Sequence, residues 1–155
     1  MASKADFGAE EWSTVLSGPP AAGLHVAMAE RGGSLREALS IGRAYAEARQ
    51  AQGANELLDE IVAEQPAVNP AEFQGENDVP GALMEKLRSA VQIVDAKATQ
   101  DDADAYKDFV QDLAQRVASA KKEGGVLGMG GKEISANEQA ALDEIASALD
   151  GDPTT

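Results

Sequence analysis

The sequence predicts an all-α fold, a single compact domain of about seven helices spanning residues 1–155. Apolar residues recur at helical spacing in nearly every segment, as at Leu83, Leu87, Val91 and Val94. No segment alternates apolar and polar residues for long enough to predict a strand. Glycines and prolines interrupt the pattern at intervals that suit helix ends. A chain of this length can bury a core without a metal or a disulfide.

The first helix is expected over residues 7–17, with Phe7 packed against Trp12 at its start as a hydrophobic staple. Pro19 and Pro20 predict its end, because an internal proline removes a helical hydrogen bond. A second helix is expected over residues 21–30, with Pro20 suited to its first turn.

A third helix is expected from about residue 35 to residue 52, where Gly53 ends it. Ser34 and Glu37 have the spacing of a capping box at its start. Its periodicity predicts a buried stripe, in which Gly42 marks a close helix crossing. The stripe consists of Leu35, Ala38, Leu39, Gly42, Tyr45 and Ala46.

Four more elements complete the predicted fold. Helices are expected over residues 55–64, from about residue 80 through residue 94, and over residues 99–124 and 136–149, and the cap of the third of these lies at Thr99 to Asp102. Residues 65–79 contain Pro66, Pro70 and Gly75 and form a long irregular connection. Residues 1–6 and 151–155 are expected to be flexible ends.

The composition excludes several classes of function. The chain has no cysteine, which excludes disulfides, thiolate catalysis and zinc–thiolate sites and fits a reducing compartment. No apolar run approaches the roughly 20 residues that span a bilayer. The first residues lack the apolar stretch of a signal peptide. We therefore expect no membrane association and a cytoplasmic location.

The formal net charge of −14 limits the partners. Phosphate backbones and anionic membranes repel such a chain unless it carries a basic patch. The basic pairs are short and lie beside carboxylates, so nucleic-acid binding is not expected. The charge keeps the protein in solution, or it forms a binding surface for cations or a basic protein partner.

A glycine-rich segment at residues 124–131 separates the last two helical patterns. Three apolar residues stand among its five glycines, which is unlike a polar flexible linker. We expect an ordered hinge whose apolar side chains pack on the helices, or else an exposed docking loop. The candidate interaction residues are Val126, Leu127, Gly128, Met129, Gly130 and Gly131.

The residues from Gly131 through Ile134 and Ser135 to Glu138, followed by an alanine-leucine helix, resemble the helix-opening motif of TerB-like tellurite-resistance domains. Those domains are acidic, all-helical bacterial modules of about this length. Their motif usually reads Asp-Gly-x-Ile/Val-Ser/Thr-x-x-Glu, with its acidic positions linked to divalent-metal binding. Gly130 stands here where the aspartate would be. Residues 123–149 also resemble the ends of small uncharacterised bacterial all-α proteins, which implies no activity.

The sequence offers few catalytic groups. His25 is the one histidine, and it lies among apolar residues, which favours a place at the edge of the core over a role as general base. Gly131 and Lys132 do not fit a Walker A loop, because Val126 stands at the first glycine position and Glu133 follows the lysine.

One acidic set is a candidate metal site. Asp104, Asp108 and Asp112 recur every four residues on one helix face, with Asp101 just before them. Carboxylate oxygens suit Ca²⁺ or Mg²⁺, but carboxylates of a single helix rarely enclose an ion. A solvated acidic face is the preferred interpretation.

These observations predict a non-catalytic structural or protein-interaction module of the bacterial cytoplasm, with no cofactor and with a protein partner or self-association. The alternative is a TerB-like acidic module that binds divalent cations, with a role in stress response.

Overall fold

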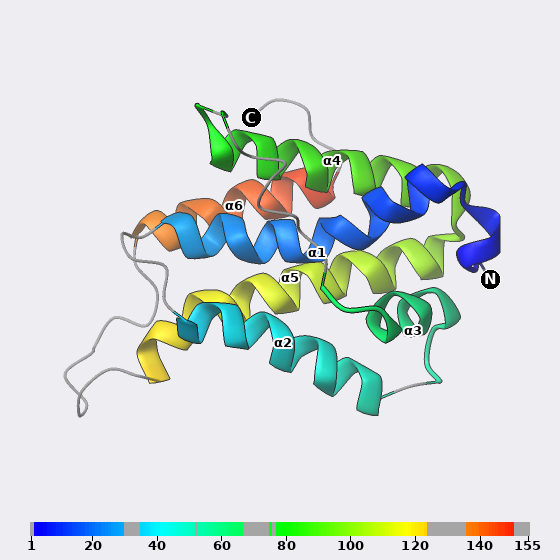
Figure 1. The fold of residues 1–155 in the computed structure, drawn as a ribbon, viewed down its shortest axis with the longest axis horizontal. Helices are drawn as coiled ribbons and strands as arrows, with labels where there is room; N and C mark the ends of the chain where they lie inside the picture. The colour runs from blue at the N-terminus through cyan, green and yellow to red at the C-terminus, as the bar shows by residue number, and fades with distance from the viewer. Residues whose placement is uncertain are drawn as a thin grey trace.

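The computed structural model describes residues 2–29, 35–51, 53–66, 75, 77–123 and 136–150, and for residues 35–38 and 121–123 it describes the helical backbone alone. A short 3-10 helix, η1 (Lys4–Asp6), precedes six α-helices. They are α1 (Ala9–Ala29), α2 (Leu35–Gln50), α3 (Glu56–Ala63), α4 (Val79–Lys97), α5 (Gln100–Glu123) and α6 (Ala136–Leu149). The described part of the chain contains no strand, so the all-α prediction is confirmed (Figure 1).

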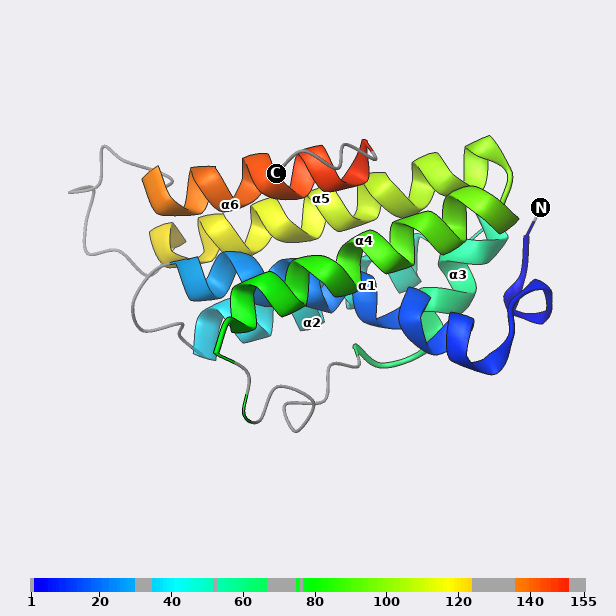
Figure 2. The same ribbon diagram turned by 90° about the horizontal axis from the view of Figure 1, so that it is seen from above.

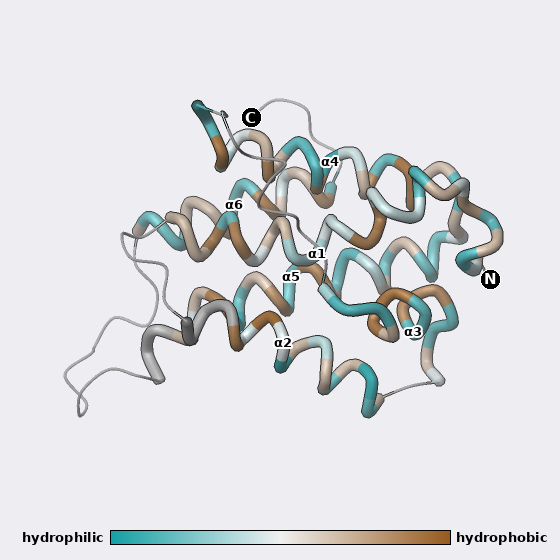
Figure 3. Tube along the Cα trace, viewed as in Figure 1, coloured by the Kyte–Doolittle hydropathy of each residue, from teal (hydrophilic) through white to brown (hydrophobic). Residues whose placement is uncertain are grey.

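Helices α1 and α5 form the centre of the bundle. Helix α1 packs against α2, α4, α5 and α6, and α5 also contacts the short α3 (Figures 1 and 2). Apolar and polar residues alternate in patches along the helices, as expected where each helix buries one face (Figure 3). The largest fully buried side chains come from all six helices and include Val15, Tyr45, Leu57, Leu83, Tyr106 and Ile145.

The number of helices differs from the prediction of seven. The described residues form six α-helices, because α1 continues through Pro19 and Pro20 where the sequence predicts a break. Pro19 has no N–H, so the carbonyl of Val15 loses its partner in the helix. The buried hydroxyl of Tyr106, on α5, donates to that carbonyl at 2.7 Å. This tertiary hydrogen bond satisfies the group that the proline leaves unpaired.

The predicted stripe of α2 is only partly correct. Tyr45 is buried as predicted, whereas Leu39 is 52% exposed and Gly42 is exposed. Ile41 and Ala44, which the predicted stripe omitted, are buried beside Tyr45. A Cβ added at Gly42 would meet nothing within 4 Å, so Gly42 marks no helix crossing. Alanine occurs on both faces of α2, at the buried Ala44 and the exposed Ala46, and packing against α5 decided which face is buried.

The close crossings occur on α1. A Cβ at Gly18 would lie 2.2 Å from the Tyr106 hydroxyl oxygen and 2.9 Å from the Cβ of Ala90. One at Gly23 would lie 2.8 Å from Leu113 and 2.9 Å from Ile41. These two glycines let α1 approach its neighbours more closely than any side chain would allow.

Several local predictions are confirmed. The rings of Phe7 and Trp12 lie 5.7 Å apart, as the staple requires. A helix begins near residue 55 as predicted, and the structure adds that Asn55 caps it by accepting a hydrogen bond from the amide of Leu58 at 2.9 Å. Gly53, just after α2, has a φ of 107°, which favours glycine. The capping box at Ser34 and the glycine-rich segment at 124–131 lie outside the described residues.

No described helix combines the length and the apolar character that crossing a membrane requires.

Candidate interaction surface on helix α5

Helix α5 separates an apolar face from an acidic one. Its buried side chains include Tyr106, Val110, Leu113 and Val117. Its exposed side chains are polar or acidic, and we call the following six the α5 surface: Asp104, Asp108, Gln111, Asp112, Gln115 and Arg116. Arg116, which is half-buried, is the basic member of this set. The surface borders two hollows, one against α2 and one against α6.

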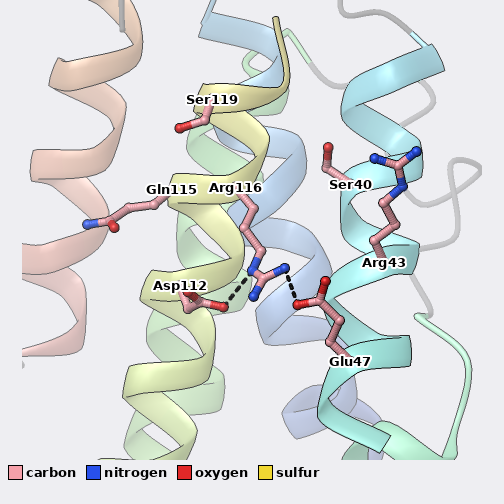
Figure 4. A pocket seen from close by; sticks show the side chains of 7 residues that line it. All are labelled: Ser40, Arg43, Glu47, Asp112, Gln115, Arg116 and Ser119. Carbon is pink, nitrogen blue, oxygen red and sulfur yellow. Dashed lines mark hydrogen bonds and ion pairs between the residues drawn. The ribbon is translucent and has the colours of Figure 1, made fainter. Parts of the chain in front are cut away.

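The first hollow lies between α2 and α5 and has a volume of about 320 Å³ (Figure 4). Its lining side chains are all polar: Ser40, Arg43, Glu47, Asp112, Gln115, Arg116 and Ser119. The guanidinium of Arg116 binds Glu47 across the hollow at 2.5 Å and Asp112 on its own helix at 2.8 Å. The hydrogen bond to Asp112, followed by that to Glu47, raises the pKa of Arg116. Arg116 thus joins α2 to α5 and stays charged.

The second hollow lies between α5 and α6 and has a volume of about 390 Å³. Asp104, Asp108 and Gln111 contribute from α5, and Leu149 and Asp150 from the end of α6. Asp104 accepts a hydrogen bond from Gln100 at 2.8 Å. Lys107, which also lines the hollow, pairs with Asp95 of α4 at 2.8 Å. Two carboxylates of α5 and that of Asp150, just after α6, therefore line one polar hollow.

The candidate metal ligands are spread along this surface. Asp104 and Asp108 border the α6 hollow, whereas Asp112 borders the α2 hollow and pairs with Arg116. Asp101 is exposed at the start of α5 and lines neither hollow. Within the described residues, no three His, Cys, Asp or Glu side chains come close enough together to hold a metal ion.

His25 lies at the edge of the core, 7% exposed, where α1 meets α6. Its Nε2 lies 2.9 Å from a carboxylate oxygen of Glu144, and its buried Nδ1 has no hydrogen-bond partner. Neither ring nitrogen contacts a serine or threonine hydroxyl, so the histidine is not part of a nucleophile–base pair in this arrangement.

Sequence reasoning missed two groups that organise the structure. The bond from Arg116 to Glu47 could not be predicted, because it depends on how α2 packs against α5. Asp102 was predicted only as part of a helix cap, yet it is 1% exposed and binds residues from two other segments. The only sequence feature that pointed to Asp102 was its position at the third residue of a helix. The candidate hinge residues, Val126 to Gly131, lie outside the described residues.

Comparison with known proteins finds no family model that matches this chain, and no curated protein or solved structure matches it either.

Proposed function

We propose that this chain is a non-catalytic helical interaction module of the cytoplasm, and that its α5 surface binds a basic segment of a protein partner. The observation that carries the proposal is the position of the α5 carboxylates. Asp112 borders one hollow and Asp104 and Asp108 border the other, so acidic groups face a polar depression on each side of α5.

The chemistry of the surface favours a cationic partner. Lysine and arginine side chains reach carboxylates with long stems, and a shallow hollow of a few hundred cubic ångströms accommodates such a stem. The net charge of −14 adds a long-range attraction that speeds encounter with a basic protein. The same negative charge repels nucleic acid and anionic lipid.

The non-catalytic part of the proposal rests on what surrounds the titratable groups. His25 binds Glu144 and has no nucleophile beside it. The two hollows contain carboxylates, amides and paired cations, and such a set lacks a group poised for proton abstraction or covalent attack. Binding is the chemistry that this arrangement performs.

The test measures binding of a fluorescently labelled lysine- and arginine-rich peptide by anisotropy, at low and at physiological salt. We expect binding that weakens with salt, since a Debye length of about 8 Å screens exposed charges at 0.15 M. The variant Asp104→Asn with Asp108→Asn should lower the affinity about tenfold, or about 1.4 kcal/mol.

The matched control is Glu10→Gln with Glu85→Gln. These two exposed carboxylates lie on α1 and α4, outside both hollows, and their removal changes the net charge by the same amount. Equal losses of affinity in both double variants would show that net charge alone attracts the peptide, and the proposed surface would then be wrong. Titration calorimetry with Ca²⁺, Mg²⁺, Mn²⁺ and Zn²⁺ tests the divalent-cation alternative on the same pair of variants.

A further inference from the structure

Residues 2–7 lie against one end of the bundle, beside α3 and the junction of α4 with α5 (Figures 1 and 2). Ala2 and Phe7 are buried at the two ends of this segment, and η1 between them is exposed. We call residues 2–7 the N-terminal strap. Phe7 packs on Trp12, and the ammonium of Lys4 lies 5.8 Å from the centre of the same indole ring.

The carboxylate of Asp102 is the innermost attachment of the strap. Its Oδ2 accepts a hydrogen bond from the backbone amide of Ala2 at 2.7 Å, and its Oδ1 accepts one from the side chain of Asn55 at 2.8 Å. Thr99 completes a reciprocal cap with Asp102, through bonds of 3.2 and 3.4 Å. A buried carboxylate is stable only while such donors replace water.

The remaining attachments are also carboxylates. Glu60 of α3 accepts a hydrogen bond from the backbone amide of Lys4. Glu64, just after α3, lies 3.0 Å from the Lys4 ammonium and 3.4 Å from the indole nitrogen of Trp12. Within the described part of the chain, the polar attachments between the strap and the rest of the bundle therefore end on carboxylate oxygens.

We propose that the N-terminal strap is a conformational switch, which opens as a unit when its carboxylate attachments are lost and exposes Trp12 while the six helices stay folded. The strap contributes only Ala2 and Phe7 to the described apolar core, whereas all other buried members of that core lie in the six helices. A segment with few buried contacts opens at a lower free energy than the whole fold.

Protonation is the simplest way to remove the attachments. Burial alone would raise the pKa of Asp102, but the bonds from Ala2, Asn55 and Thr99 outweigh it and lower that pKa. The hydrogen bond from Lys4, followed by that from Trp12, lowers the pKa of Glu64. The closed strap therefore binds fewer protons than the open one. Its stabilisation is complete above the ordinary carboxyl pKa of about 4 and is lost as the pH falls through the lowered values.

Other charged groups lie on the strap and on the elements beside it. The strap carries Lys4 and Asp6, and Asp6 accepts from the amide of Ser3 at 2.8 Å. Helix α1 contributes Glu11, paired with Lys97 of α4 at 2.6 Å. Helix α3 adds Glu56 and Asp59 to Glu60 and Glu64, and α5 adds Asp101 and Asp104. The hydrogen bonds that the Asp102 carboxylate accepts within the described residues come from neutral donors.

Trp12 is the one tryptophan of the chain, so its fluorescence reports the strap. We would record acrylamide quenching of Trp12 and far-ultraviolet circular dichroism together, from pH 7 down to pH 2. The quenching constant should rise at least about twofold at a pH where the helical signal is still that of the native protein. Coincident changes in both signals would show that the strap opens only when the whole protein unfolds, and would overturn the proposal.

The variant Asp102→Asn tests the switch at neutral pH. An asparagine turns a donor toward Ala2 or Asn55, so we expect the same twofold rise in quenching with native circular dichroism. Asp101→Asn is the matched control, because Asp101 is the exposed neighbour on the same turn, and it should leave the quenching unchanged. Native quenching in Asp102→Asn, or equal effects of both variants, would contradict the proposal.

Hydrogen exchange on the unaltered protein covers the case in which Asp102→Asn fails to fold. The amides of Ala2 and Lys4 should exchange at least about tenfold faster than the interior amides of α5. Exchange of the two sets at one rate would show that strap and core open together, which would also overturn the proposal.

Discussion

The side-chain nitrogen of Asn55 donates to Oδ1 of the buried Asp102 at 2.8 Å. The side-chain oxygen of Asn55 caps α3 by accepting from the amide of Leu58. Asp102 in turn belongs to the cap of α5 and binds the amide of Ala2. One pair of side chains thus couples the starts of two helices to the N-terminal strap. This junction explains why a polar pair is buried at the edge of an otherwise apolar core.

The variant Asn55→Ala should destabilise the protein by about 1–3 kcal/mol, since it removes a helix cap and leaves one oxygen of a buried carboxylate without its donor. Urea unfolding followed by circular dichroism measures this change. The control Asn77→Ala, at an exposed bend, should stay within about 0.5 kcal/mol of the original protein. Equal effects of the two substitutions would show that the junction is energetically unimportant.

Tyr106→Phe should cost about 1–3 kcal/mol, because the carbonyl of Val15 is buried and Pro19 cannot donate to it. A double-mutant cycle with Pro19→Ala tests whether the Tyr106 hydroxyl compensates for the missing N–H of the proline. The alanine supplies the missing N–H, so the loss of the Tyr106 hydroxyl should cost less than half as much in that background. If Tyr106→Phe costs the same with and without Pro19, the hydroxyl is not compensating for the proline.

Substitution by alanine should change the stability of the protein in opposite directions at two helical glycines. Gly18→Ala places a methyl group 2.2 Å from the Tyr106 oxygen and should destabilise the protein by about 1–3 kcal/mol. Gly42→Ala meets nothing within 4 Å and should stabilise α2 by up to about 1 kcal/mol. Thermal unfolding of both variants checks the pair, and a stabilising Gly18→Ala would refute the close crossing of α1 with α5.

The sequence makes a separate prediction for the glycine-rich segment at residues 124–131. If its apolar side chains leave water, Leu127→Asp should destabilise the whole domain, since burying one such side chain contributes roughly 1.5–3 kcal/mol. Asp108→Asn, on the exposed face of α5, should leave the melting temperature unchanged. An unchanged melting temperature in Leu127→Asp would favour an exposed docking loop instead.

Local patterns predicted the features that act over a few residues. The staple of Phe7 on Trp12, the cap at Thr99 and the end of α2 at Gly53 each depend on neighbours in the chain. The acidic face of α5 follows from the four-residue spacing of its aspartates in the same way. Its two hollows could not be predicted, because they require the positions of α2 and α6.

By itself the sequence determined the all-α class, most helix ends and the acidic charge, because helical periodicity and capping are local properties. The tertiary structure decided that α1 continues through Pro19 and Pro20, which face of α2 is buried, and what Asp102 binds. The hydroxyl that satisfies the Val15 carbonyl comes from a residue 91 positions away, and the donor from Ala2 reaches Asp102 across 100 positions. Such partners are supplied only by packing, so no local pattern could contain them.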